Sequence, residues 1–138
     1  MLSNQRGMTL IEIMIVIVII GGLMAMLGTR VMKNFEKAKV KEAAIQLNEI
    51  GKQLELYYTD CNEYPSSDIG LDALLSEEGT NCESWGPEPY IGKKLLKDPW
   101  GTDIEYDNDG GAFILRSLGK DKKPGGTGFD KDITNEEE

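Results

Sequence analysis

Glu12 is the first residue whose position suggests chemistry, because it is the only charged residue in the apolar run from Met8 to Leu27. At about 1.5 Å per helical residue, this run would span about 30 Å, which is the thickness of the hydrocarbon core of a bilayer. A carboxylate at the bilayer centre costs about 2.5–3.5 kcal/mol. Glu12 is therefore a candidate functional residue. The alternative is an interfacial side chain that extends to the lipid headgroups.

Two cysteines, Cys61 and Cys82, form the second candidate group. The chain has no histidine, which excludes histidine acid–base chemistry, the common zinc sites and a Cys–His nucleophile. Enzymatic activity is therefore not expected. In an oxidising compartment the simplest interpretation of the cysteines is one disulfide, which would close a loop of about 20 residues and contribute roughly 3 kcal/mol. Two free thiols are the alternative.

Three aspartates, Asp121, Asp130 and Asp132, lie in a Gly-rich stretch near the C-terminus. The glycines predict that no regular element forms there, and a long loop in a small domain needs something to hold it. Carboxylates, together with free main-chain carbonyls near Ser117 and Leu118, are oxygen ligands of the kind that calcium prefers. On these residues alone, acids that are simply solvated are the more common interpretation.

A long helix is expected to position Glu12 and the first cysteine. No proline interrupts the chain between Met8 and Tyr58, so one helix of about 50 residues is predicted. Its second half carries an apolar stripe with a 3-4-3-4-3 spacing, which is typical of a helix face that packs on a core. The stripe consists of Val40, Ala43, Leu47, Ile50, Leu54 and Tyr57.

The rest of the chain is expected to form one small domain with a sheet. A short helix is predicted over residues 70–78, between the cysteines. Strands over residues 103–106 and 112–117 flank Asn108-Asp-Gly-Gly, which is a hairpin signal. Pro99 and Gly101 predict a turn that buries Trp100 beneath this sheet. The predicted fold class is α+β.

The charge of the chain limits its partners. Lys and Arg number 15 against 24 Asp and Glu, a formal net charge of −9, whereas nucleic acids attract a positive surface. Nucleic acid is therefore not an expected partner. Arg6 is the only charged residue before the apolar run, so the positive-inside rule predicts that the segment before the run stays in the cytoplasm and the rest crosses the membrane. An uncleaved signal anchor with a periplasmic domain also fits these observations.

The start of the chain, Arg6–Glu12 (RGMTLIE), resembles the class III leader of type IV pilins and pseudopilins. The resemblance implies that a membrane peptidase cuts after Gly7 and methylates the new amino terminus at Met8. In a filament, Glu12 of one subunit would then neutralise the Met8 amine of its neighbour, and this pairing would fix the axial register. The chain departs from the family at Met8, where Phe is usual, and at Thr29, where Pro is common.

A second resemblance, to the major pseudopilins of type II secretion systems, rests on Asp98-Pro99-Trp100-Gly101, on Tyr106 and on the order of Tyr64-Pro65, Gly70-Leu71, Trp85 and Tyr90. It implies a pilin-like fold in which a long N-terminal helix, transmembrane in its first half, packs on a small antiparallel sheet closed by a C-terminal calcium loop. It also implies that calcium is held by Asp121 and Asp132, which match best, with Asp130 and the carbonyls of Ser117 and Leu118.

By this resemblance residues 1–7 are a cleaved leader, residues 8–29 a transmembrane assembly helix and residues 30–138 a periplasmic globular domain. The chain would be a single-pass protein of the bacterial inner membrane that polymerises with itself. Its other implied partners are minor pseudopilins, an inner-membrane assembly platform and a prepilin peptidase, and the filament would help to export folded proteins across the outer membrane. The alternatives are a type IV pilin of a surface filament and a monomeric, membrane-anchored, calcium-binding periplasmic module.

Overall fold

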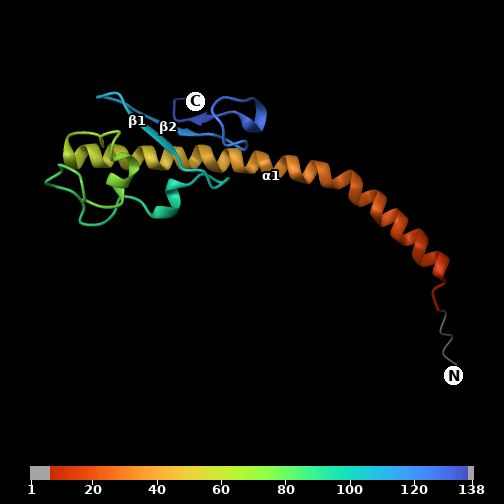
Figure 1. Cartoon of the computed structure of the whole chain (residues 1–138). Helices are drawn as coiled ribbons and strands as arrows, with labels where there is room; N and C mark the ends of the chain where they lie inside the picture. Colours follow the sequence, from red (N-terminus) through yellow and green to blue (C-terminus); the bar gives the residue numbers. More distant parts are fainter. Residues whose placement is uncertain (1–6, 137–138) are drawn as a thin grey trace, which may run out of the picture. The chain divides into compact units, whose positions relative to one another are not determined.

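The computed structural model describes residues 7–136, and its main element is a single helix, α1, from Leu10 to Cys61 (Figure 1). The predicted long helix is therefore confirmed. α1 ends at Cys61 because the next residue, Asn62, adopts a left-handed conformation with φ of 59°. The Asn62 amide donates to the carbonyl of Tyr58 at 2.8 Å, which satisfies one of the last helical carbonyls. The chain divides into two compact units, with the boundary between Glu36 and Lys37.

In the unit from Lys37 onward, the second part of α1 packs on a three-stranded antiparallel sheet of order β1-β2-β3. Strand β1 is Glu105–Asn108, β2 is Phe113–Ser117 and β3 is Ile133–Thr134. The predicted hairpin joins β1 to β2, with Asn108 opposite Phe113. β3 was not expected from the sequence, and it pairs with the end of β2 with Ser117 opposite Ile133.

Three short 3-10 helices complete this unit: Gly70–Leu74, Lys93–Leu96 and Gly128–Asp130. The first replaces the longer helix predicted over residues 70–78; Ser76 and Thr80 instead lie in turns that their amides form with Asp72 and Glu77. The third lies inside the Gly-rich stretch, where the sequence predicted no regular element. That prediction was wrong, because hydrogen bonds between parts of the stretch, such as Lys120 N–H to the Phe129 carbonyl at 3.1 Å, hold it in a defined shape.

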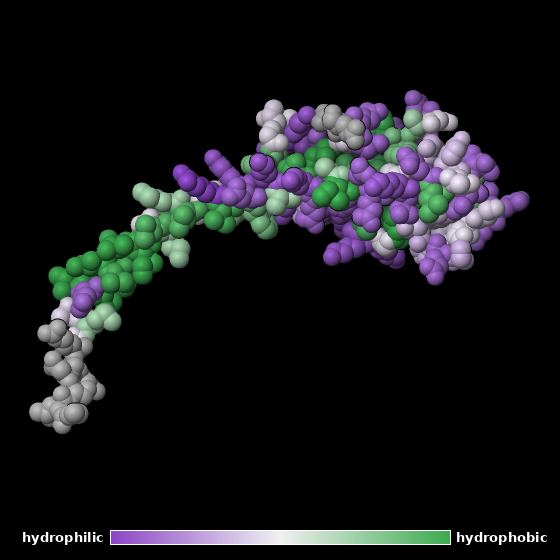
Figure 2. Space-filling model, turned by 180° about the vertical axis from the view of Figure 1, so that it is seen from behind, coloured by the Kyte–Doolittle hydropathy of each residue, from purple (hydrophilic) through white to green (hydrophobic). Residues whose placement is uncertain are grey.

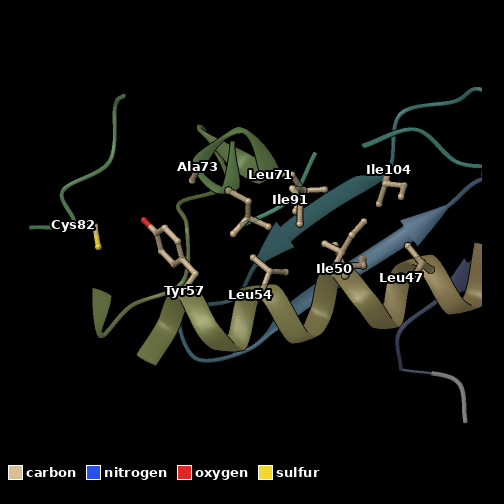
Figure 3. Close-up of a cluster of buried hydrophobic side chains, with 11 residues drawn as sticks. Leu47, Ile50, Leu54, Tyr57, Leu71, Ala73, Cys82, Ile91 and Ile104 are labelled. Carbon is tan, nitrogen blue, oxygen red and sulfur yellow. The ribbon is translucent and has the colours of Figure 1, made fainter. Parts of the chain in front are cut away.

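The core lies between α1 and the segments that cover it, and Figure 3 shows side chains of Leu47, Ile50, Leu54 and Tyr57 pointing from α1 into it. Ala43 and these four residues are buried as the stripe predicted, while Val40 is half-buried. Leu71, Ala73, Leu74, Cys82, Ile91, Ile104 and Leu115 supply the opposite side. Trp100, predicted as a buried anchor, is only half-buried and lies outside this cluster, whereas Trp85 packs against it.

Candidate functional site

The first candidate site is the start of α1, where Thr9 and Glu12 cap the helix. The amide of Glu12 donates to the Thr9 hydroxyl at 3.3 Å, and the amide of Thr9 donates to Glu12 Oε2 at 3.4 Å. This reciprocal arrangement is a capping box, with Thr before the helix and Glu at its third position. The Thr-x-x-Glu spacing was a signal for this local role, but the sequence interpretation considered only the charge of Glu12. In the single chain the Glu12 carboxylate therefore accepts a hydrogen bond from the Thr9 amide at the start of its own helix.

Gly7 and Met8, the two residues at the expected cleavage position, precede this cap and are exposed. Residues 1–6 of the expected leader, including Arg6, lie outside the described residues. Thr9 separates Met8 from the first helical residue, Leu10. A new amino terminus at Met8 would therefore begin one residue before the capping box.

The first part of α1 presents an apolar surface with no cover from the single chain. An 18-residue window of the helix reaches a mean hydropathy of 2.8, and none of it is buried. Figure 2 shows this part as nearly continuous green, in contrast to the mostly purple surface of the globular unit. Among the described residues, α1 is the one helix long and apolar enough to cross a membrane. Its composition suits a lipid environment or contact with similar helices.

Cys61 and Cys82 form a disulfide, with Cα atoms 5.0 Å apart, which confirms the pairing favoured from the sequence. The bond ties the last residue of α1 to the segment after the first 3-10 helix. Beside it, the Tyr90 hydroxyl donates to Asp60 at 2.7 Å. Burial, and then this hydrogen bond, raise the pKa of Tyr90 above its ordinary value. The disulfide and this hydrogen bond hold the C-terminal end of α1.

The second candidate site is the C-terminal loop between β2 and β3. Ser117 lies opposite Ile133, so the next positions across the two strands are Leu118 and Asp132. Asp132 Oδ1 is buried and has no hydrogen-bond partner among residues 7–136. A buried carboxylate oxygen without a partner is costly unless a cation or water satisfies it. The strands thus bring together three of the five residues expected to hold calcium.

The other two acids differ from Asp132. Asp121 and Asp130 are exposed, and Asp121 Oδ1 accepts a hydrogen bond from the Lys123 amide at 3.1 Å. Within the described part of the chain, no three His, Cys, Asp or Glu side chains are grouped so that they could hold a metal ion. A calcium ion here would thus depend on main-chain carbonyls as well as carboxylates, which calcium accepts readily. The partnerless oxygen of Asp132 fits such an ion.

Glycines let the loop fold tightly on itself. Gly119 has φ of 70°, and a Cβ atom there would lie 2.8 Å from the carbonyl of Lys131. Gly126 has φ of 85°, and a Cβ atom there would collide with the main-chain carbonyl of Asp130. The amide of Asp132 also donates to the Gly125 carbonyl at 3.1 Å. The shape of the loop therefore depends on residues without side chains at these points.

Asp98 is a residue that the sequence interpretation missed as part of this region. It is only 5% exposed, and its two carboxylate oxygens are both hydrogen-bonded. Oδ1 accepts from the amides of Trp100 and Thr102, and Oδ2 accepts from the hydroxyl of Ser117 at 2.7 Å. The Asp-Pro-Trp-Gly turn was recognised as a sequence motif, and its aspartate makes a buried hydrogen bond with Ser117 at the end of β2.

The sequence of this chain is similar to two described protein families. Residues 30–136 match the family described as "Type II secretion system (T2SS), protein G", and residues 2–28 match the "Prokaryotic N-terminal methylation motif". The "Type II secretion system core protein G" of Pseudomonas aeruginosa is 42% identical over 136 residues, which cover 96% of this chain and 95% of that protein. The protein of the same description from Xanthomonas campestris pv. campestris is 40% identical over 133 residues, covering 95% and 90%.

A solved structure is similar as well. It is the crystal structure of the major pseudopilin from the type 2 secretion system of enterohaemorrhagic Escherichia coli, with a TM-score of 0.62 and 30% sequence identity. The similarity covers 75% of this chain and 91% of that one. The long helix on a small three-stranded sheet is thus shared with a protein of known architecture.

Proposed function

The chain belongs to the type II secretion system protein G family and is a major pseudopilin. We propose that it polymerises through the apolar part of α1 into a periplasmic pseudopilus. This filament would drive the export of folded proteins across the outer membrane. The family is structural and non-enzymatic, and it implies pilus-like polymerisation and processing of the amino terminus. The observation that carries the proposal is the exposed apolar surface of the first part of α1, none of which the chain buries. Neighbouring copies would cover this surface as they leave the lipid.

Glu12 is the residue that would order this assembly. Its carboxylate is the only acid of the apolar segment, and surrounding it with neighbouring helices would remove it from water and headgroups. A charge in such surroundings needs a partner of opposite sign. After cleavage the Met8 amine of a neighbouring subunit would supply one, whether or not it is methylated. The capping box holds Glu12 in a defined place at the helix start until this partner arrives.

The experiment that tests this role compares Glu12→Gln with Glu12→Ala in cells that assemble the filament. Glutamine can still accept the Thr9 amide, so Glu12→Gln removes the charge and keeps the cap. We expect both variants to insert into the membrane and to lose filament assembly. Glu136→Gln, which removes one exposed charge near the C-terminus, is the matched control. Normal filaments from Glu12→Gln would contradict the charge pairing and leave Glu12 with a capping role only.

We also propose that the loop between β2 and β3 binds calcium. Asp132 and the main-chain carbonyls of Ser117 and Leu118 would hold the ion, with Asp121, and then Asp130, as further carboxylates. The bound ion would stabilise the loop, because residues 118–132 contribute nothing to the hydrophobic core cluster that could hold the loop in place. Support comes from the buried Asp132 Oδ1 that has no partner among residues 7–136.

Calcium binding predicts that chelation destabilises the folded chain, because a ligand that binds only the folded state stabilises it. The test is the melting temperature of the full chain in detergent micelles, with EGTA and with saturating calcium. Asp132→Asn should abolish the difference between the two conditions. Asp109→Asn, at an exposed turn of the hairpin, should preserve it. A wild-type melting temperature that does not respond to calcium would refute the assignment.

The processing and location of the chain complete the proposal. We propose cleavage between Gly7 and Met8 with methylation of Met8, a transmembrane assembly helix over residues 8–29 and a periplasmic domain over residues 30–138. The chain would be held in the inner membrane by one span and would meet the prepilin peptidase, the assembly platform and minor pseudopilins there. Mass spectrometry of the native protein tests this directly. A mature protein that still carries Met1 would contradict both the cleavage and the amine that Glu12 needs.

The alternatives fit the similarities less well. A type IV pilin of a surface filament would share the methylation motif, but the match of residues 30–136 is to type II secretion protein G. A monomeric calcium module would leave the apolar surface of α1 without a role beyond anchoring.

A further inference from the structure

The buried carboxylate of Asp98 connects the Asp-Pro-Trp-Gly turn to the end of β2. Oδ1 accepts the amides of Trp100 and Thr102 at 3.0 and 2.9 Å, and Oδ2 accepts the hydroxyl of Ser117 at 2.7 Å. Three donors compensate the cost of burying this charge and allow it one orientation. The two amides of the turn therefore hold the Asp98 carboxylate, and this carboxylate orients the side chain of Ser117.

Ser117 is where the chain leaves the sheet and enters the C-terminal loop. It is the last residue of β2 and is fully buried. Its hydroxyl also lies 3.5 Å from the amide of Gly119, so the same oxygen can contact Asp98 and the first turn of the loop. Leu118, between them, is buried as well. The main chain at residues 117–119 is thus held from the Asp98 side, while Asp132 approaches from β3.

We propose that Asp98 is a positioning residue for calcium, acting through the hydroxyl of Ser117 to set the main-chain carbonyls of Ser117 and Leu118. The inference rests on the proposed calcium binding of the loop. Main-chain carbonyls cannot be reoriented by changing a rotamer, so a site that uses them needs its backbone placed in advance. Groups that orient metal ligands typically change the metal affinity by about 10–100-fold when they are removed.

The test measures calcium affinity by titration calorimetry on the mature full chain in detergent micelles. Ser117→Ala removes the hydroxyl that bridges to Asp98 and leaves the main-chain carbonyl of residue 117 in place. Asp98→Asn keeps the shape of the side chain and an oxygen for the two turn amides, but removes the charge that accepts the hydroxyl. Thr102→Val is the matched control. The Thr102 hydroxyl is buried in the same turn and has no hydrogen-bond partner among residues 7–136, while the amide that binds Asp98 is unchanged.

We expect Ser117→Ala and Asp98→Asn each to raise the calcium Kd by about 10–100-fold, and Thr102→Val to leave it within about twofold. Melting temperatures in EGTA and in saturating calcium provide the second readout. A positioning role predicts that, at the same fixed calcium concentration, the stabilisation gained from calcium is smaller in both variants than in the wild type. A purely structural role would lower both melting temperatures equally and leave Kd unchanged.

The outcomes separate the inference from the proposal beneath it. Wild-type Kd values in Ser117→Ala and Asp98→Asn would overturn the positioning role while calcium binding stands. Absence of calcium binding to the wild-type chain would overturn the calcium proposal itself. If Ser117→Ala does not fold, the Kd of Asp98→Asn decides the question alone, because its amide oxygen can retain the turn.

Discussion

Removing the Cys61–Cys82 disulfide should destabilise the folded domain by an amount that follows from the size of the loop it closes. The two residues are separated by 21 positions. For a loop of that length, the chain-entropy relation gives a loss of about 3.3 kcal/mol in the free energy of unfolding at 25 °C. For a domain of roughly 100 residues, about 4 °C per kcal/mol converts this to a fall of about 13 °C in melting temperature.

The assay is urea unfolding of the full chain in detergent micelles, followed by the fluorescence of Trp85 and Trp100. Cys61→Ala, Cys82→Ala and the double variant should all lose about the same free energy, because either single change removes the whole cross-link. Wild-type protein reduced with a phosphine is the control for packing, since it keeps both sulfur atoms. Without the cross-link the unfolded chain expands and exposes more surface, so the slope of the free energy against urea should also rise.

Two results would refute this reasoning. A loss below about 1 kcal/mol in the reduced wild type would mean that the unfolded chain is already compact between the cysteines, so that the cross-link restrains little. Losses of the two single variants that add up in the double variant would show that packing around each sulfur dominates, and not the closed loop. Cys82 is 5% exposed, so its packing is the larger of the two contributions to check.

Three further predictions each concern a substitution at a single residue. Leu54→Ala should lower the free energy of unfolding by about 2–5 kcal/mol in the same urea assay, because Leu54 is fully buried in the core. Gly126→Ala should abolish the response of the melting temperature to calcium, because a Cβ atom there collides with the Asp130 carbonyl; an unchanged response would show that the loop can refold around it. Burial raises the pKa of Tyr106, whose hydroxyl donates to the Pro65 carbonyl at 2.7 Å. The unfolded chain therefore releases this proton first, above its ordinary pKa of about 10, and stability should fall as pH rises through that value. Tyr106→Phe should cost about 1 kcal/mol at neutral pH and show a smaller fall in chemical melts between about pH 9 and 11; an equal fall in both proteins would contradict the assignment to Tyr106.

Much of the fold could be predicted from the sequence because its signals are local. The absence of proline and the regular apolar spacing of α1 need only neighbouring residues, and both were confirmed by the helix and by the buried side chains of Leu47, Ile50 and Leu54. The hairpin followed from four residues at its turn. The end of the helix also has a local signal in Asn62, a residue type that tolerates a left-handed conformation.

The strand β3 and the role of Asp98 could not be predicted in this way. β3 has two residues and exists because Ile133 pairs with Ser117, 16 positions earlier, and no local pattern carries that information. Asp98 contacts Ser117 across 19 positions. The burial of Trp100 was predicted from the size of its ring, but its short turn leaves it half-exposed. Residues whose partners are distant in the chain account for most of what the sequence left open.

The hydrophobic cluster draws all its members from Leu47 onward, so the globular unit needs nothing from the apolar segment to complete its interior. This unit can therefore complete its core as a monomer, at any concentration. Growth of the filament proposed above would then add subunits that are already folded. The free energy of the proposed assembly would then not be consumed by ordering this unit, and a subunit that leaves the filament would remain folded.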